Sequence, residues 1–402
     1  MEPVWRLELY VAAISYPTPT KKFQKNEFSH CVPGLGCATK GAIEYMASNG
    51  GVVFGNPFRR ALVTGGLGFI GSNLSLRLAA AGCHVTVVDS SVPGCGANPY
   101  NLHSAPAIRV LPADIGSPED LAAEIRAADV IFNLAGEVSH IHSMRCPARD
   151  AELNAGAHLR FVEGCARFAP GVRIVYASTR QIYGAPRYLP VDEAHPIQPV
   201  DFNGVHKYAA TSYHLMYQAM GQLDARVLCL TNVYGPRMAL HIPGQGFLGN
   251  FLRRVLSGQP LEVFGDGRQL RDPVYVDDVV DAFLAAAAAE NPPVRLWNVG
   301  GIEALSLASI ARAIGNTAGA PPPTFRPFPA EQKSIDIGSY TTDSSRIRHD
   351  LGWHPRVTFH RGVALSLEFF RRELQQYLPA AAAIFGDPRP RDLSDRRSAV
   401  RM

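Results

Sequence analysis

The sequence predicts a doubly wound α/β fold, in which helices cover both faces of a parallel sheet. Three observations support this fold class. A short apolar stretch at 61–63 ends in a glycine-rich turn, and a second one at 84–88 ends on an aspartate. A helical apolar pattern joins the two stretches, and strand and helix patterns keep alternating as far as Arg237. Such alternation is typical of a parallel sheet with right-handed crossovers.

The segment from Arg60 to Asp89 has the pattern of a dinucleotide-binding unit, although an ordinary glycine-rich turn is the alternative. Gly65 permits a tight turn, Gly68 lets the backbone approach a pyrophosphate, and Gly71 lets helix and strand pack closely. The start of the helix presents free N–H groups to the phosphates. Asp89 can accept a hydrogen bond from the ribose 2′-hydroxyl, which is phosphorylated in NADP. The segment therefore predicts a Rossmann-type domain that binds NAD.

The other elements of this domain follow in chain order. We expect strands at 108–111, 129–134, 172–176 and 226–230, and helices at 117–126, 148–168 and 203–220. Beyond Arg237 the strict alternation fails. There we expect helices at 247–257, 277–289 and near 361–377, with strands at 261–264 and 274–276. This mixed pattern predicts a smaller α/β domain that closes over the carboxyl edge of the sheet.

These patterns divide the chain into four parts. Residues 1–58 form an N-terminal extension with little periodicity, which could be disordered or lie upstream of the true start. Residues 59–237 form the NAD-binding domain, and 238–377 mainly the substrate-binding domain. Residues 378–402 are a tail rich in proline, alanine and arginine.

Composition excludes several classes of protein. The 402 residues are 47% hydrophobic and 18% charged, which is typical of a globular protein, and the net charge is only +4. No apolar run approaches the roughly 20 residues that span a bilayer, and no basic stripe with interleaved aromatics suggests nucleic acid. The seven cysteines lack paired spacings, which favours free thiols in the cytoplasm. The pair Asp277-Asp278 is most simply a helix cap, so no metal is expected.

Further polar or small residues follow other expected strands, at the edge where open α/β sheets bind ligands. Asp114 and Ile115 could bind and pack on an adenine, and 133–136 brings small residues near a cofactor. The segment 176–179 offers hydroxyls to a substrate. Each of these features alone could equally be a cap or a tight turn.

Four motifs in a fixed order resemble a known family. They are Thr64 to Gly71, Tyr176 to Thr179 with Tyr183-Gly184, Asn232 to Arg237, and Leu270 to Asp272 before Val274 to Asp278. From about Arg60 to Phe370 the chain resembles the extended short-chain dehydrogenase/reductase family. Within it, the chain is similar to the NAD-dependent epimerase/dehydratase group, which acts on nucleotide sugars.

The resemblance implies a transient oxidation, in which NAD⁺ takes a hydride from a sugar carbon and later returns it. The family's serine or threonine falls on Thr179, with Ser178 beside it, and its lysine falls on Lys207, which would bind the nicotinamide ribose. The implied cofactor-binding residues are Gly65, Gly68, Phe69, Ile70, Gly71, Asp89, Asp114, Ile115, Leu134, Ala135, Gly136, Ser178, Lys207 and Val233.

The resemblance also places a substrate diphosphate. Arg237 and Arg271 would hold it, because a guanidinium presents a bidentate fork to phosphate. Asn232 would add a hydrogen-bond donor, and Thr179 would contact the sugar. For any single arginine, an ordinary solvated side chain is the alternative.

One position departs from the family pattern at the residue that accepts the proton of the sugar hydroxyl. Asn203 stands where the family has its catalytic tyrosine, four residues before Lys207, and an amide cannot accept a proton at neutral pH. Residues three and four apart share a helix face, so Asn203, His206 and Lys207 lie together. His206 is a speculative substitute base, because histidine ordinarily titrates near neutral pH; a packing or surface histidine is the alternative.

A second departure concerns the reaction type. Arg180 and Gln181 follow Thr179, where 4,6-dehydratase relatives carry the acid and base that eliminate water. We therefore expect an epimerase that inverts C4 of a UDP-hexose through a 4-keto intermediate. We also expect a homodimer formed through helices 148–168 and 203–220. The alternatives are an NAD-binding sensor or scaffold with a lost active site, and a dehydratase or oxidoreductase with an atypical base.

Overall fold

The computed structural model describes residues 45–46, 52–53, 58–242 and 246–378, and the expectations for most of 1–58 and for the tail lie outside these ranges. β1 (Tyr45–Met46) and β2 (Val52–Val53) form an antiparallel pair. None of the helices in the described ranges is long and apolar enough to cross a membrane.

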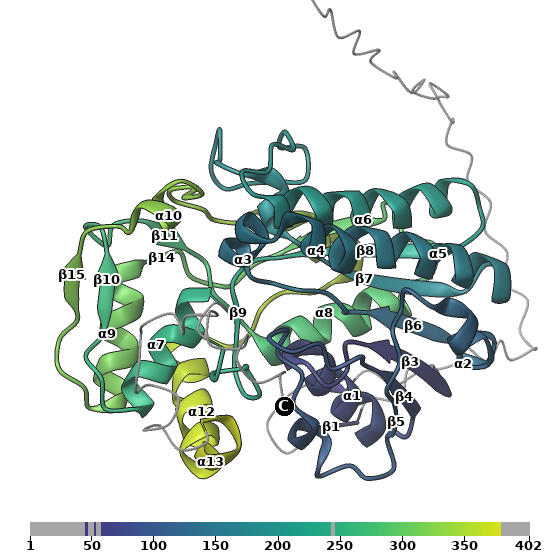
Figure 1. The fold of residues 1–402 in the computed structure, drawn as a ribbon, viewed down its shortest axis with the longest axis horizontal. Coiled ribbons are helices and arrows are strands. Elements are labelled where there is room, and N and C mark those ends of the chain that lie inside the picture. The colour runs from purple at the N-terminus through teal and green to yellow at the C-terminus, as the bar shows by residue number, and fades with distance from the viewer. Residues whose placement is uncertain (1–44, 47–51, 54–57, 243–245, 379–402) are drawn as a thin grey trace, which may run out of the picture. The chain divides into compact units, whose positions relative to one another are not determined.

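A seven-stranded parallel sheet forms the centre of the fold (Figure 1). Its order is β13-β8-β7-β6-β3-β4-β5. The strands are β3 (Arg60–Thr64), β4 (His84–Val88), β5 (Arg109–Leu111), β6 (Val130–Asn133), β7 (Arg173–Thr179), β8 (Asp224–Leu230) and β13 (Leu296–Val299). The order reverses beside β3, which is where such sheets open a crevice for ligands. The predicted fold class is confirmed.

Helices cover both faces of this sheet. They are α1 (Phe69–Ala80), α2 (Ala122–Ala127), α3 (His140–Arg145), α4 (Pro147–Ala151), α5 (Ala157–Phe168), α6 (Phe202–Ala219) and α8 (Val276–Ala288). Ala61 and Val63 pack toward α1 and α8, whereas Leu62 between them packs toward α2 and α5, as the two-residue period of a strand requires. In Figure 1, α5 and α6 lie side by side on one face.

Two predicted helices are less regular than expected. The helix expected at 117–126 begins with a 3₁₀ turn at Pro118–Leu121, and the Ser117 hydroxyl makes no capping hydrogen bond. The helix expected at 148–168 contains a π-helical turn, Glu152–Gly156, between α4 and α5. Such turns are frequent at functional sites, and this one carries Asn154, whose side chain is buried beside the cavity described below.

The C-terminal part has its own apolar core, formed by α7 (Gly246–Leu256), α9 (Leu307–Ala318) and α12 (Phe359–Arg372). Its other elements are β9 (Val233–Tyr234), β10 (Glu262–Phe264), β11 (Leu270–Arg271), β12 (Val274–Tyr275), β14 (Leu305–Ser306), β15 (Thr324–Arg326), α10 (Ala330–Lys333), α11 (Ser345–Leu351) and α13 (Leu374–Tyr377). Two elements that follow Arg237 belong to the central sheet instead. They are α8, which covers one face of the sheet, and β13, which pairs with β8. We did not expect a strand at 296–299.

A buried polar network ties the strands together at their carboxyl ends. Asn133, at the end of β6, accepts a hydrogen bond from the Thr64 hydroxyl of β3 at 2.7 Å. Its amide nitrogen lies 3.0 Å from His158 of α5 and 3.1 Å from His214 of α6. Burial lowers the pKa of His214 to about 4 and that of His158 well below its usual value. Both imidazoles are therefore neutral at pH 7 and can accept from the amide.

Candidate active site

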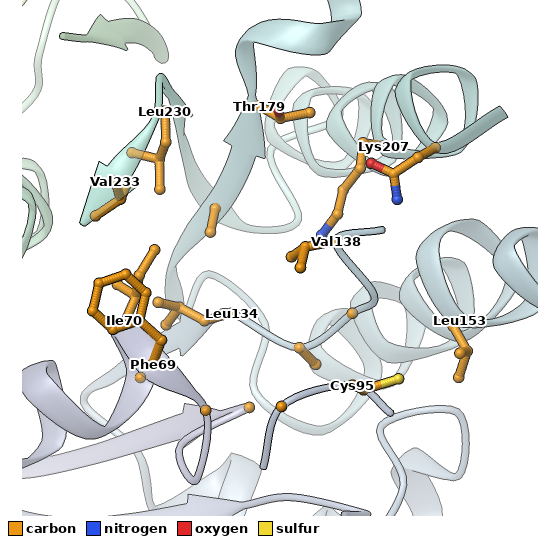
Figure 2. A pocket seen from close by; sticks show the side chains of 18 of the residues that line it. Phe69, Ile70, Cys95, Leu134, Val138, Leu153, Thr179, Lys207, Leu230 and Val233 are labelled. Atoms are coloured by element: carbon orange, nitrogen blue, oxygen red, sulfur yellow. The ribbon is translucent and has the colours of Figure 1, made fainter. Parts of the chain in front are cut away.

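A cavity of about 450 Å³ opens at the carboxyl edge of the sheet (Figure 2). The glycine-rich turn after β3 forms one wall, and the ends of β4, β6 and β7 form the floor. Side chains of α6 and α7 close the other sides. All of the residues predicted to bind the cofactor line this cavity, although they come from segments far apart in the sequence.

The glycine-rich turn after β3 forms a cradle in which Gly65 and Gly71 have no room for a Cβ. Gly65 has φ +65°, and a Cβ there would lie 2.7 Å from the Leu134 carbonyl oxygen. A Cβ on Gly71 would meet the Gly65 carbonyl oxygen, and one on Gly136 would lie 2.8 Å from the Lys207 ammonium nitrogen. Because these positions have no room for a side chain, the backbone of the turn itself lines the cavity. The cradle fits the pyrophosphate of a dinucleotide, which binds to backbone N–H groups at the start of a helix.

Asp89 shapes the same wall of the cavity. Its carboxylate accepts hydrogen bonds from the backbone N–H of Leu67 at 3.0 Å and of Ser91 at 2.9 Å. Burial raises the pKa of Asp89, and these two hydrogen bonds oppose the shift. A carboxylate has about four acceptor positions, so Asp89 can hold the turn and still accept from a ribose hydroxyl.

Thr179 and Lys207 face the cavity from two different elements. Thr179 ends β7, and its hydroxyl accepts a hydrogen bond from the Gln181 backbone at 3.2 Å. Lys207 comes from α6, with its ammonium 5.6 Å from the centre of the Tyr176 ring, and Figure 2 shows its side chain extending toward Val138. Burial lowers the pKa of Lys207 to about 8, while Asp150 partly opposes this shift. Lys207 therefore remains mostly protonated at pH 7.

Asn203 is a tightly bonded member of the cavity wall. Its amide nitrogen donates to the Glu137 carbonyl oxygen at 3.0 Å and to Asp150 at 3.1 Å. Its backbone N–H donates to the Ser143 hydroxyl at 3.2 Å. The Asn203 side chain thus connects α6 to the segment that follows β6.

His206 lies next to the same aspartate, on a different side. Its Nδ1 is 2.7 Å from the second carboxylate oxygen of Asp150, which is almost completely buried. Asn203 and Lys207 line the cavity, and His206 does not. The structure thus brings the predicted asparagine and lysine to the site and leaves the predicted histidine outside its wall.

The residues predicted to bind the substrate diphosphate also differ in whether they line the cavity. Asn232 and Arg271 line the cavity. Among the described residues, neither the Asn232 side-chain oxygen nor the Arg271 Nε has a hydrogen-bond partner. Arg271 donates through Nη1 to the carbonyls of Leu270 and Gly338, at 2.7 and 2.6 Å. Burial, and then Arg180 nearby, lower the pKa of Arg271 to about 9. Arg271 thus lines the cavity with one buried N–H that no described residue accepts.

Arg237 has other contacts and does not line the cavity. It adopts the left-handed conformation, with φ +72°. Its Nη1 donates to the Asn73 side chain at 2.9 Å, and its guanidinium lies 5.2 Å from the centre of the Phe369 ring. In this conformation Arg237 joins the two parts of the fold at their boundary.

Two further ionisable side chains line the cavity. The Arg180 guanidinium stacks on the Tyr340 ring at 4.9 Å, and its Nη1 has no hydrogen-bond partner. His140, at the start of α3, places its Nδ1 3.0 Å from a carboxylate oxygen of Asp201. Sequence reasoning weighed Arg180 but missed His140. The only signal for His140 is its place shortly after a predicted strand, because its carboxylate partner is distant in the sequence.

Comparison with known proteins agrees with this geometry. Residues 61–300 match the model of the NAD dependent epimerase/dehydratase family. The chain belongs to this family. NAD is accordingly its cofactor, and the glycine cradle and Asp89 fit it. The family resemblance predicted from the motifs is therefore confirmed.

Individual relatives are similar over most of the chain. A UDP-glucose 4-epimerase of Mycolicibacterium smegmatis is 36% identical, over 79% of this chain and 100% of the relative. UDP-glucuronic acid decarboxylase 2 of Arabidopsis thaliana is 29% identical, over 85% of this chain and 76% of the relative. The structure of Thermus thermophilus UDP-glucose 4-epimerase with NAD has a TM-score of 0.68 and 29% identity, covering 78% and 99% of the two chains. The family thus includes both isomerases and lyases.

The buried charge of Lys207 generates a prediction about stability. An exposed lysine has a pKa of 10.5, whereas burial lowers that of Lys207 to about 8. Below pH 8 the folded state carries the full desolvation penalty, which disappears as the pH rises to 10.5 because the folded protein loses its proton first. In cofactor-free protein, Lys207→Met should therefore increase the free energy of unfolding at pH 7 by at most about 3 kcal/mol, with much less effect at pH 10.

Urea unfolding of both proteins at the two pH values measures this difference. Lys333→Met is the matched control, since the Lys333 side chain is 63% exposed and its replacement relieves no comparable burial of charge. A Lys207→Met protein that is less stable than the wild type at pH 7 would contradict the expectation.

Proposed function

We propose that the protein is a nucleotide-sugar epimerase that inverts C4 of a UDP-hexose through a transient 4-keto intermediate. The observation that carries the proposal is one cavity that joins the NAD cradle to Thr179, Lys207 and Arg271. Bound NAD supplies the hydride acceptor and later returns the hydride. The 36% identical relative named UDP-glucose 4-epimerase supports the same assignment.

The side chains around the cavity suit an epimerase better than a dehydratase. Elimination of water needs an acid and a base beside the sugar, whereas Arg180 and Gln181 occupy that part of the wall. Neither exchanges a proton near neutral pH. Epimerisation needs only hydride transfer, a proton acceptor and room for the keto sugar to turn over. In this proposal the Thr179 hydroxyl binds the reacting sugar oxygen, and Arg271 with Asn232 binds the diphosphate.

Incubation of the NAD-loaded protein with UDP-glucose and with UDP-galactose tests the proposal. We expect each sugar to be converted into the other, as measured by NMR, with transient absorbance of reduced nicotinamide at substoichiometric levels. Thr179→Val should slow conversion by about 10-fold to 100-fold, because a hydrogen bond to a group that gains charge is worth roughly 1.5–3 kcal/mol. Bound NAD without any reduced cofactor or product, across a broad panel of nucleotide sugars, would favour the sensor hypothesis.

Arg180 favours a second candidate substrate, a nucleotide-linked uronic acid. Its guanidinium stacks on Tyr340, and its Nη1 is buried without a hydrogen-bond partner among the described residues. The charges of Asp272 and Asp201 act on Arg180, but neither carboxylate forms an ion pair with it. A sugar carboxylate at C6 would supply a hydrogen-bonding anion for this buried nitrogen. The similarity to a UDP-glucuronic acid decarboxylase is consistent with this chemistry.

A comparison of UDP-glucuronate with UDP-glucose tests this second candidate. We expect Arg180→Gln to lower kcat/KM for UDP-glucuronate by about 10-fold to 100-fold, the value of a charged hydrogen bond, and to affect UDP-glucose much less. Equal losses for the two substrates would show that Arg180 does not bind the carboxylate.

We also propose that two copies of the chain associate through α5 and α6. These helices expose apolar side chains to solvent, with Leu159 of α5 40% and Met216 of α6 61% exposed. Light scattering after size-exclusion chromatography should give the mass of a dimer, and Met216→Glu should shift it toward a monomer. Phe325→Glu, at an exposed position of β15, is the matched control and should leave the dimer intact. A monomeric wild type would contradict the proposal.

A further inference from the structure

The proposed reaction needs a group that accepts the proton of the sugar hydroxyl, and Asn203 cannot do so. Three histidines lie near it, each beside a buried carboxylate. His140 is 3.0 Å from Asp201, His206 is 2.7 Å from Asp150, and His142 pairs with Glu137. The first two pairs join the segment that follows β6 to the start of α6, and the third lies within that segment.

Access to the cavity distinguishes the three histidines. His140 lines the cavity together with Thr179 and Lys207, and 34% of its side chain is exposed. Neither His142 nor His206 lines the cavity. Of these three imidazoles, His140 is therefore the one that a substrate in the cavity can contact.

Hydrogen bonds hold His140 near the position of the absent tyrosine. The Asn203 amide donates to the carbonyl of Glu137, three residues before His140, and the Asn203 backbone donates to the hydroxyl of Ser143, three residues after it. The start of α3 is thus bound to position 203 from both sides. A proton acceptor at His140 lies beside the site where the family places its phenol.

Asp201 is itself firmly placed. One carboxylate oxygen accepts from the Gly204 backbone at 2.7 Å and so caps α6. The other accepts from the Gln181 amide at 3.1 Å and faces His140 Nδ1. The side chain of Asp201 is 1% exposed. Gln181 also connects this carboxylate to Thr179, because its backbone donates to the Thr179 hydroxyl.

A carboxylate beside one ring nitrogen of a histidine determines whether the other ring nitrogen can accept a proton. His140 Nδ1 lies 3.0 Å from the buried Asp201 carboxylate, close enough for the carboxylate to favour a ring proton on Nδ1, although the two atoms are not aligned for a hydrogen bond in this structure. Nε2 is then the acceptor. His140 and Asp201 together therefore have the parts of a general base and its orienting partner.

We propose that His140, oriented by Asp201, is the acid–base group that replaces the tyrosine at this site, an inference that rests on the proposed function. In the oxidation, the sugar O–H bond breaks and its proton moves to His140 Nε2. The adjacent C–H bond gives its hydride to NAD⁺, and the C–O bond becomes a carbonyl. In the reduction each transfer is reversed, and His140 returns the proton to the oxygen of the new alcohol. Asp201 is a positioning residue and takes no proton.

Two histidine variants of the NAD-loaded protein test the proposal. His140→Ala should slow both nicotinamide reduction and epimer formation by about 100-fold to 10,000-fold, the usual contribution of a general base. Its NAD content and UDP-glucose affinity should stay close to those of the wild type. Added imidazole should restore part of the rate. His142→Ala is the matched control, because that histidine lies on the same short helix beside a buried carboxylate, and it should retain its rate.

A second readout does not depend on turnover. The ¹⁵N spectrum of histidine-labelled protein should show the His140 signal, absent from His140→Gln, with its proton on Nδ1. Asp201→Asn should change this tautomer equilibrium. Because Asp201 also caps α6, His140→Gln provides the test if the Asp201 variant does not fold.

The outcomes separate this inference from the proposed function. If the wild type epimerises its substrate and His140→Ala keeps the full rate, His140 is not the base and the proposed function stands. A large loss in His206→Ala with none in His140→Ala would assign the role to His206 instead. If the wild type acts on no nucleotide sugar, the proposed function fails, and with it the acid–base role of His140.

Discussion

The close approach of two strand ends determines where everything else in the site can lie. At the carboxyl edge of the sheet, the backbone after β3 touches the backbone after β6, with no space for a Cβ on Gly65. Beneath this contact, the Thr64 hydroxyl donates to Asn133, whose amide nitrogen reaches α5 and α6. One contact and one polar network therefore position the cofactor cradle and both helices that flank it.

The cavity is lined by cationic side chains that are buried from water. Burial lowers the pKa values of Lys207 and Arg271, because a low-dielectric environment disfavours their charged forms. Such charges destabilise the protein without a ligand and interact strongly with an anion that enters. Their burial thus lowers the stability of the empty protein and favours an anion in the cavity. Asp201 and Asp150, in contrast, already have partners within the protein and serve to hold their neighbours in place.

Asn203 is held firmly by its surroundings. Its amide donates to a carbonyl and to a carboxylate, and its backbone donates to a hydroxyl. All three bonds reach the segment after β6, which carries His140. The asparagine therefore has a structural role of its own, one that a phenol could not fill, because a tyrosine has a single hydroxyl in place of the two amide donors.

Local patterns in the sequence determined the Rossmann-type sheet, the glycine cradle, Asp89 and the positions of Thr179 and Lys207. These features depend on short segments, such as the turn at 64–71, in which each residue type has its own conformational requirement. Tertiary structure alone decided that β13 joins the sheet and that Arg237 and His206 lie outside the cavity wall. It also decided that His140 meets Asp201, a contact between residues far apart in the chain. No local rule encodes such contacts, because packing of distant segments produces them.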